Sequence, residues 1–162
     1  MGYQVGDKVV YGPHGAGVVV ETVYRDDDWG EYLSIRIAQS NMTLMVPAKA
    51  ADEKGVRPVI KKTRAKQLLG SLKEVGSSLP DNPQHRAREG QERTKTGDAD
   101  ELAAVLRDYT ELERAGKKLS ATELRTLTSA KQLFASEIAM VEDIDIDKAL
   151  ERIELALGNE IE

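Results

Sequence analysis

GVVVETVYRDDDWGEYLSIRIA, residues 17 to 38, contains two β-rich runs separated by a polar turn. In the second run Leu33, Ile35 and Ile37 alternate with polar residues, which is the pattern of a strand with one buried and one wet face. The aspartates between the runs, followed by Gly30, are typical of a hairpin loop. This stretch therefore predicts two antiparallel strands that share an apolar face.

Shorter runs of the same kind lie on either side, at residues 8 to 11 (KVVY) and 42 to 46 (MTLMV). Pro47 ends the last run because proline has no N–H to donate to a neighbouring strand. Four or five short strands with tight connections predict a small Tudor- or SH3-like antiparallel β-barrel within residues 1 to 60. An edge strand of such a domain would leave unpaired backbone groups that a partner's strand could use.

Beyond Pro58 the apolar residues recur at helical spacing, which predicts a compact helical bundle of about five helices over residues 61 to 162 and an α+β fold class. The expected helices are a stripe from Leu68 to Val75 closed by Gly76, a charged segment from 84 to 95 terminated by Gly97, a helix from Asp98 to Gly116, a long helix opened by the capping box Ser120 to Glu123, and a last helix from about Ile146 to Gly158.

The charge of the chain is unevenly distributed. The 162 residues carry a net charge of −5, but residues 61 to 97 hold nine Lys or Arg against four Asp or Glu. Residues 1 to 60 hold six against eight, and residues 98 to 162 hold eight against sixteen. A basic island in an acidic protein favours local contact with a polyanion such as DNA, and the simpler alternative is a solvated helix face.

Composition argues against most catalytic classes. There is no cysteine, and the only two histidines, His14 and His85, are too far apart in sequence for a helical metal motif. No G-x-S-x-G accompanies either of them, so we expect no enzyme, no metal and no cofactor. No apolar run reaches the roughly 18 residues of a membrane span. Asp7 and Lys8 interrupt the segment where a signal peptide would be apolar, so a cytoplasmic protein is expected.

Four short motifs of the first third stand in a characteristic order: VGDKVVY at 5 to 11, PHG at 13 to 15, EYL at 31 to 33 and VP at 46 to 47. Together they resemble the RNA polymerase-interacting domain of the CarD/CdnL family of bacterial transcription regulators. This Tudor-like domain is shared with the transcription-repair coupling factor.

The helical part is similar to the C-terminal domain of the same family, through TGD at 96 to 98, VLRD at 105 to 108 and LSATE at 119 to 123. The resemblance implies a monomeric, non-enzymatic regulator. Its N-terminal domain would bind the protrusion lobe of the RNA polymerase β subunit. Its C-terminal domain would touch promoter DNA at the upstream edge of the transcription bubble and favour the open complex.

The resemblance also implies which residues bind polymerase. Arg25 matches a family arginine that contacts polymerase, whereas Met45 stands where a second such arginine precedes the Val-Pro pair. We therefore expect docking to depend less on charge and more on apolar and backbone contacts through Leu44, Met45, Val46 and Pro47.

The implied DNA contact departs from the family at one position. The family commonly places a tryptophan wedge after the asparagine that precedes the basic segment, but here Asn82 is followed by Pro83. Proline offers less apolar area and cannot stack as an indole does, so the wedge contribution should be reduced. The expected DNA-binding residues are Pro83, His85, Arg86, Arg88, Arg93 and Lys95.

Other interpretations remain open at this point. The chain could be a stand-alone nucleic-acid-binding module, which the acidic loop at 26 to 28 opposes, or a protein adaptor whose basic stretch is only surface. Trp29 beside that loop either folds back over the sheet or contacts a partner.

Overall fold

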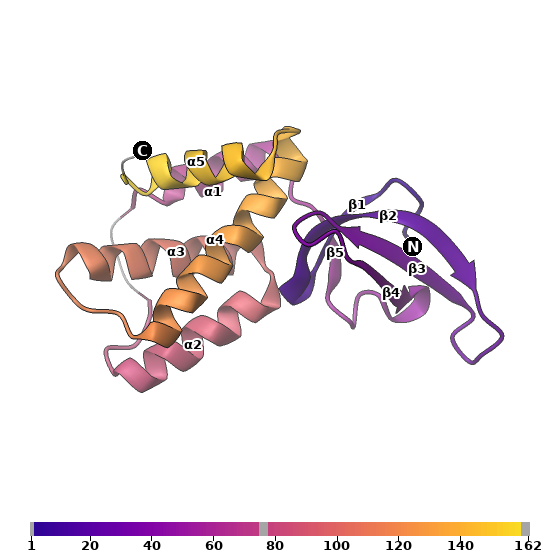
Figure 1. The fold of residues 1–162 in the computed structure, drawn as a ribbon, viewed down its shortest axis with the longest axis horizontal. Helices are drawn as coiled ribbons and strands as arrows, with labels where there is room; N and C mark the ends of the chain where they lie inside the picture. The colour runs from indigo at the N-terminus through magenta and orange to yellow at the C-terminus, as the bar shows by residue number, and fades with distance from the viewer. Residues whose placement is uncertain (1, 75–77, 160–162) are drawn as a thin grey trace.

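The computed structural model describes residues 2–74 and 78–159, and within these ranges it contains a sheet followed by a helical bundle (Figure 1). The strands are β1 (Lys8–Tyr11), β2 (Gly15–Tyr24), β3 (Glu31–Ile37), β4 (Thr43–Pro47) and β5 (Val56–Pro58). The helices are α1 (Lys62–Ser71), α2 (Pro83–Thr96), α3 (Ala99–Arg114), α4 (Ala121–Glu142) and α5 (Ile146–Ala156). The expected end of the first helix at Val75 and Gly76 lies outside the described residues.

The five strands form one antiparallel sheet in the order β4-β3-β2-β1-β5. The α+β class and the Tudor-like domain are confirmed, but the sheet is not closed into a barrel. Closure would require β4 to pair with β5, and β5 has only three residues and ends at Pro58, which cannot donate to a ladder. Strand β4 is therefore a true edge.

The apolar face of the sheet is the one that the alternation in β3 indicated. Leu33, Ile35 and Ile37 are at most 1% exposed, and they pack with Val9 and Val46 among others. Across the sheet, Leu33 is paired with Val46 and Ile35 with Leu44. One core thus fixes the register of β3 against the edge strand.

The helices begin at the caps that the sequence indicates. The Ser120 side chain accepts a hydrogen bond from the Glu123 N–H while the Glu123 carboxylate accepts from the Ser120 N–H, which completes the capping box of α4. Asp98 caps α3, and Asn82 caps α2 with Pro83 in the first turn. These caps satisfy amides that have no partner within their helices.

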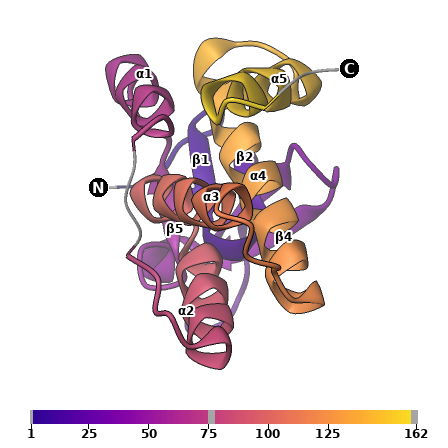
Figure 2. The same cartoon turned by 90° about the vertical axis from the view of Figure 1, so that its left-hand side faces the viewer.

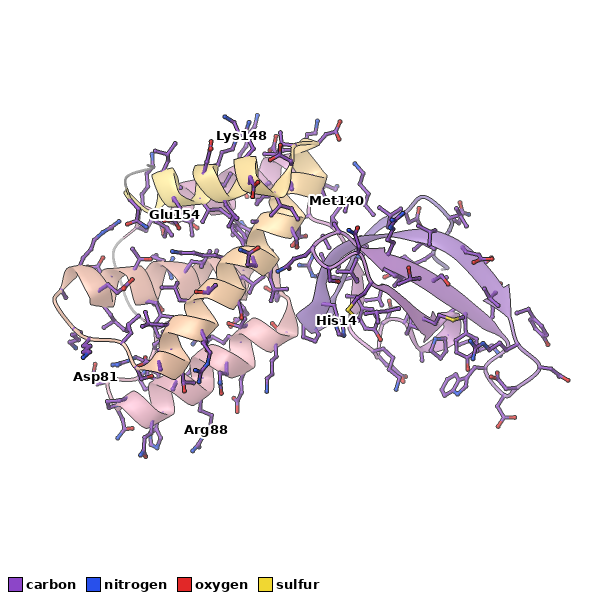
Figure 3. The ribbon with its side chains drawn as sticks, viewed as in Figure 1. His14, Asp81, Arg88, Met140, Lys148 and Glu154 are labelled. Carbon is purple, nitrogen blue, oxygen red and sulfur yellow. The ribbon has the colours of Figure 1, made fainter. Side chains whose placement is uncertain are left out.

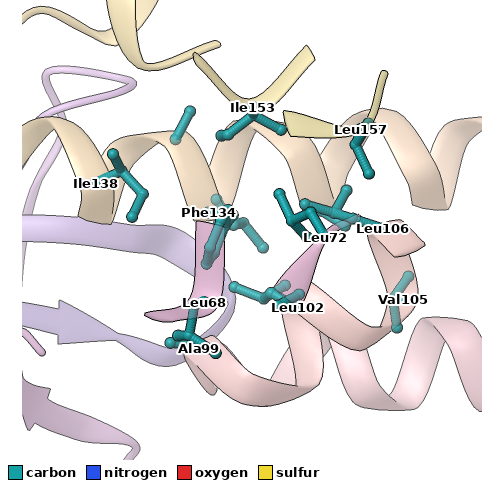
Figure 4. Close-up of a cluster of buried hydrophobic side chains, with 14 of the residues drawn as sticks. Leu68, Leu72, Ala99, Leu102, Val105, Leu106, Phe134, Ile138, Ile153 and Leu157 are labelled. Carbon is teal, nitrogen blue, oxygen red and sulfur yellow. The ribbon is translucent and has the colours of Figure 1, made fainter. Parts of the chain in front are cut away.

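The bundle is built around α3 and α4, with α1 and α5 on one side of them and α2 on the other (Figures 1 and 2). Tyr109 of α3 and Phe134 of α4 are fully buried at its centre. Leucine and isoleucine side chains from α1, α3, α4 and α5 surround them (Figure 4).

The sheet and the bundle are joined through the middle of α4. The Ser136 hydroxyl accepts a hydrogen bond from the Ala16 N–H of β2 at 3.1 Å. Lys8 of β1 donates to the Met140 carbonyl at 3.2 Å. At Gly97, which has a φ of 71°, a Cβ would overlap the Gly12 carbonyl, so only glycine permits this approach of the chain after α2 to the sheet.

A bidentate ion pair strengthens this junction. Both terminal nitrogens of Arg57 donate to the Glu137 carboxylate, at 2.7 and 2.8 Å, and the Ile60 N–H donates to it at 2.9 Å. Arg57 also donates to the Gly97 carbonyl at 2.7 Å. Burial lowers the pKa of Arg57, but the hydrogen bonds and charge of Glu137 outweigh it and raise the pKa overall. One arginine therefore connects β5, the end of α2 and α4.

A close approach inside the bundle gives a testable prediction. Gly90 lies in α2 where a Cβ would overlap the hydroxyl of the buried Tyr109. We expect Gly90→Ala to lower the free energy of unfolding by about 1–3 kcal/mol, because the overpacked ring has no free space to enter. The matched control is Gly70→Ala in α1, where no atom beyond the helix's own neighbouring backbone lies within 4 Å of the added Cβ. There alanine should stabilise by up to about 1 kcal/mol. Urea unfolding measures both, and equal stabilisation of the two variants would contradict the packing described.

Candidate protein-binding edge and nucleic-acid interface

Strand β4 presents unpaired backbone groups to solvent. The Ile37 N–H donates to the Met42 carbonyl at 2.8 Å, and hydrogen-bonded pairs in an antiparallel ladder recur every second residue. Leu44 therefore bonds to β3, whereas Thr43 and Met45 direct their N–H and C=O groups away from the sheet. A partner strand could pair with these groups.

The predicted polymerase-binding residues of β4 divide between the two faces. Val46 is 1% exposed and Leu44 is half-buried, and both pack in the sheet core. Met45 is 37% exposed and lies with Pro47 on the opposite face. Val46 therefore contributes to an interface only through its backbone and by holding the strand in place, whereas Met45 and Pro47 offer side-chain surface.

The structure brings Arg25 to the same face. Its guanidinium lies over the Tyr32 ring, 5.1 Å from the centroid, and Nη2 is 3.2 Å from the Met45 sulfur. Tyr32 is in turn the cross-strand neighbour of Pro47. Sequence reasoning did not single out Tyr32, although the pairing of β3 with β4 would have placed it on the same face as Pro47.

The acidic hairpin loop next to Arg25 is held by Asp27. Its carboxylate accepts hydrogen bonds from the Tyr32 hydroxyl at 2.9 Å and from the N–H groups of Trp29 and Gly30. Desolvation raises the pKa of Asp27, but these hydrogen bonds and the nearby Arg25 outweigh it and lower the pKa. Trp29 is 44% exposed, so the loop presents an indole beside this surface.

The first predicted DNA-binding arginine, Arg86, lies inside the bundle. It is 5% exposed, and its Nε and Nη2 donate to the Glu123 carboxylate at 2.6 and 3.2 Å. Its Nη1 donates to the Asp81 carbonyl at 3.4 Å. This ion pair joins the first turns of α2 and α4, and it leaves the Arg86 side chain no surface for a phosphate.

The environment of this ion pair shifts three pKa values. The Glu123 hydrogen bond outweighs desolvation and raises the pKa of Arg86. Desolvation raises the pKa of Glu123, but hydrogen bonds from Arg86 and Ser120 outweigh it and lower the pKa. Burial raises the pKa of Tyr109, whose hydroxyl donates to the Arg86 carbonyl, to about 12.

Arg93 is also engaged within the protein. Its guanidinium donates to Glu89 at 2.6 Å and to the Ser78 hydroxyl at 2.8 Å, and it lies 3.4 Å from Glu101. Its charge is balanced by these carboxylates, so it adds little to the field outside α2.

Two of the predicted cations remain available on α2. Arg88 and Lys95 are exposed, and neither has an ion-pair partner among residues 2–74 and 78–159. They lie on one side of the helix because they are seven positions apart, and Figure 3 shows Arg88 projecting away from the bundle. Pro83 and His85 are exposed in the first turn of the same helix.

A groove between α2 and α4 adds a cation that sequence reasoning missed. Lys95 and Arg125 line this groove of about 240 Å³ together with Thr126 and Ser129. Arg125 also has no ion-pair partner in the described part of the chain. It lies in the acidic third, so counting charge by segment gave it no weight. The three exposed cations Arg88, Lys95 and Arg125 are termed the α2–α4 cations below.

The groove adjoins a second hollow of about 420 Å³, which shares Pro13, Ser129 and Leu133 with it. His14 and Gln132 line this second hollow, and Figure 3 shows His14 where the sheet meets the bundle. Most of the residues that line the two hollows carry a hydroxyl, amide, imidazole or cationic group. Hydroxyl, amide and cationic groups of this kind contact the sugar–phosphate backbone in nucleic-acid complexes.

Comparison with known proteins assigns the family. A model described as "CarD-like/TRCF RID domain" matches residues 3–60, and one described as "CarD, C-terminal domain" matches residues 67–154. The chain belongs to the CarD family of transcription regulators. Its N-terminal match is to an RNA polymerase-interacting domain, which implies RNA polymerase as a partner.

A curated relative agrees with this assignment. The chain is 28% identical over 144 residues to "Putative transcription factor YdeB" of Bacillus subtilis (strain 168), a match that spans 88% of this chain and 94% of the relative. Within residues 2–74 and 78–159, each helix is too short or too polar to span a lipid bilayer.

The buried ion pair of Arg86 with Glu123 predicts acid sensitivity. The pKa of Glu123 is lowered from its ordinary value of 4.5, so its contribution to stability is complete above pH 4.5 and is lost as the pH falls through the lowered pKa. We expect Arg86→Gln/Glu123→Gln to reduce the loss of unfolding free energy between pH 5 and pH 3, measured by urea unfolding. The exposed pair Arg64 and Asp100 provides the control Arg64→Gln/Asp100→Asn, which should keep the steep dependence of the unaltered protein. Equal pH profiles for the unaltered protein and the Arg86/Glu123 variant would contradict the prediction.

Proposed function

We propose that this CarD family member is a non-enzymatic regulator that binds the RNA polymerase β subunit and stabilises the promoter open complex. The observation that carries the proposal is that a free sheet edge and a set of exposed cations belong to two parts of one structure that hydrogen bonds of α4 and Arg57 join. The edge is β4, and the cations are the α2–α4 cations. In this proposal residues 1–60 bind polymerase, residues 61–162 contact DNA, and the protein acts as a monomer.

Polymerase binding would use strand addition at β4. The outward backbone groups of Thr43 and Met45 supply hydrogen bonds, and the surface of Arg25, Tyr32 and Pro47 supplies side-chain contacts. We propose the protrusion lobe of the β subunit as the partner because of the family resemblance. Arg25 stacks on Tyr32 and contacts Met45, so its charge acts together with an apolar surface at this site.

DNA contact would use the α2–α4 cations, with Pro83 and His85 at the exposed start of α2. Three phosphate contacts correspond to a slope of about −2.7 in the logarithm of the binding constant against that of salt concentration. Such binding is weak by itself. Attachment to polymerase would raise the effective concentration of the cations at the upstream edge of the bubble.

Stabilisation of the open complex would follow from differential affinity. A factor that contacts melted or bent promoter DNA more strongly than the closed duplex shifts the equilibrium by that difference alone. Coupling free energies of about 1–3 kcal/mol change the ratio of open to closed complex about 5- to 150-fold.

Strand addition predicts the effect of removing one backbone donor. Met45→Pro deletes an N–H that makes no bond to β3, so the sheet should stay folded. We expect affinity for the isolated protrusion lobe to fall at least about tenfold, a loss of about 1.4 kcal/mol, measured by calorimetry. The matched control Met45→Leu keeps the N–H and should bind within about threefold of the unaltered protein. Tight binding by the proline variant would argue against pairing at this edge.

The proposed DNA contact predicts that removing the α2–α4 cations weakens DNA binding and shortens the open-complex lifetime but leaves polymerase binding intact. We expect Arg88→Gln/Lys95→Gln/Arg125→Gln to bring the salt slope for duplex binding from about −2.7 to near zero. Open complexes formed with polymerase and this variant should dissociate about 5-fold faster or more, as filter binding after heparin challenge would show. The control Lys54→Gln/Lys61→Gln/Lys117→Gln removes three exposed lysines from other surfaces and should change neither quantity. An unchanged open-complex lifetime in the α2–α4 variant would favour a protein adaptor instead.

A further inference from the structure

The side of the bundle opposite α2 carries a groove that the proposed polymerase and DNA contacts do not use. A groove of about 290 Å³ lies between the last turns of α1 and α5, lined by Leu69, Lys73, Arg152, Leu155 and Ala156 together with Gly70. Leu155 is 60% exposed, the highest value for a large apolar side chain in the described part of the bundle. The floor of this groove is apolar, which is costly to leave in water and is characteristic of a binding site.

The α1 side of the groove is strongly basic. Lys62, Lys66 and Leu69 fall at positions i, i+4 and i+7 of α1, so they follow one edge of the helix, and Lys73 lies in the turn that follows Ser71. None of the three lysines has a carboxylate within ion-pair distance among the described residues. Leu69 and Lys73 line the groove, so this basic edge of α1 borders it.

The α5 side repeats the pattern. Lys148, Arg152 and Leu155 are at i, i+4 and i+7, and Arg152 and Leu155 line the groove. Arg152 is 4.0 Å from Glu142, at the limit of an ion pair, and Lys148 is 3.6 Å from Glu151. Both cations are about half-exposed, so these pairs contribute little to stability and leave the two side chains accessible to a ligand carboxylate.

We propose that the α1–α5 groove binds an acidic amphipathic helix of a partner protein. Leucines on one face of such a helix would cover Leu69, Leu155 and Ala156, and glutamates beside them would meet Lys73 and Arg152. Charge complementarity identifies an acidic partner, and the apolar floor identifies a peptide, because a phosphate backbone has no apolar surface to bury there. The proposal does not depend on polymerase or DNA binding.

The position of the groove separates this partner from DNA. Helices α1 and α5 lie on the far side of α3 and α4 from α2 in both views (Figures 1 and 2). A ligand in the groove would therefore leave the α2–α4 cations free. The two basic surfaces would serve two ligands of different chemistry.

Fluorescence anisotropy with the full chain tests the proposal. The probe is a synthetic fluorescein-labelled helix with leucines at i, i+3, i+4 and i+7 and glutamates elsewhere. The control probe has lysine in place of every glutamate. We expect saturable binding of the acidic probe only, with amide shifts in NMR spectra concentrated at Leu69, Lys73, Arg152 and Leu155.

Variants at exposed positions keep the test independent of folding. Lys73→Glu/Arg152→Glu should weaken binding of the acidic probe at least tenfold, and Leu155→Gln should weaken it at least threefold. The control Lys49→Glu/Lys54→Glu makes the same charge change on the sheet side and should bind the probe as the unaltered chain does. Thermal melting of each variant verifies that it is folded.

Four outcomes would overturn the proposal. The first is that the acidic probe does not bind, or that the groove variants and the control variant lose affinity for it equally. The second is binding of a 12-base-pair DNA duplex that Lys73→Glu/Arg152→Glu weakens as strongly as it weakens binding of the acidic probe. The third is self-association of the unaltered chain that Leu155→Gln abolishes, which would assign the groove to a second copy. The last is a gain of tenfold or more in probe affinity when residues 160–162, Glu-Ile-Glu, are deleted, which would assign it to the chain's own acidic terminus.

Discussion

The ion pair of Arg57 with Glu137 is the interaction on which the arrangement of the two parts depends. Glu137 is 1% exposed and accepts three hydrogen bonds, from two nitrogens of Arg57 and from the Ile60 N–H. Removing one partner from such a pair leaves a buried charge without compensation, which is more costly than the net value of the pair itself. Because Arg57 also holds the Gly97 carbonyl, the strand before the bundle, the end of α2 and the middle of α4 are tied at one point. The angle between sheet and bundle is therefore set by charge and hydrogen bonding rather than by apolar packing alone.

The basic island of residues 61 to 97 has a different meaning in three dimensions from the one it has in sequence. Five of its nine cations lie at residues 61 to 73, within α1 or in the residues that flank it, and four lie on α2. Of those four, Arg86 and Arg93 form ion pairs with carboxylates of α2, α3 and α4, so their charges are neutralised within the bundle. The net positive field of α2 comes from Arg88 and Lys95, to which Arg125 is added from α4. A charge count along the chain thus combines the α1 and α2 surfaces, which lie on opposite sides of the bundle. It also omits Arg125, which belongs with the cations of α2.

Local features of the fold were predictable, and non-local ones were not. Alternation in β3 and the caps at Asp98 and Ser120 act within a few residues, so the strands, the helix starts and the apolar faces follow from the sequence. Strand β5 was not identified because three residues ending in proline carry no period. The pairing of Arg86 with Glu123 joins residues 37 positions apart, and that of Arg57 with Glu137 joins residues 80 apart. No local rule indicates which arginine of a basic segment will be buried, so the candidate DNA surface could be predicted as a helix but not as a set of exposed side chains.

The contacts that hold the sheet and the bundle together have an energetic consequence for the proposed coupling. If the bundle were joined to the sheet by a flexible tether, each encounter of Arg88, Lys95 and Arg125 with DNA would require ordering of that tether, and the entropy lost would reduce the coupling free energy. Here this ordering has already occurred during folding, because Glu137, Ser136 and the contact of Gly12 with Gly97 hold the bundle on the sheet. In the proposed complex, a few phosphate contacts of modest individual strength would then act at a high effective concentration once β4 is bound. In the proposed complex, these junction contacts would also favour DNA whose backbone lies within reach of the α2–α4 cations.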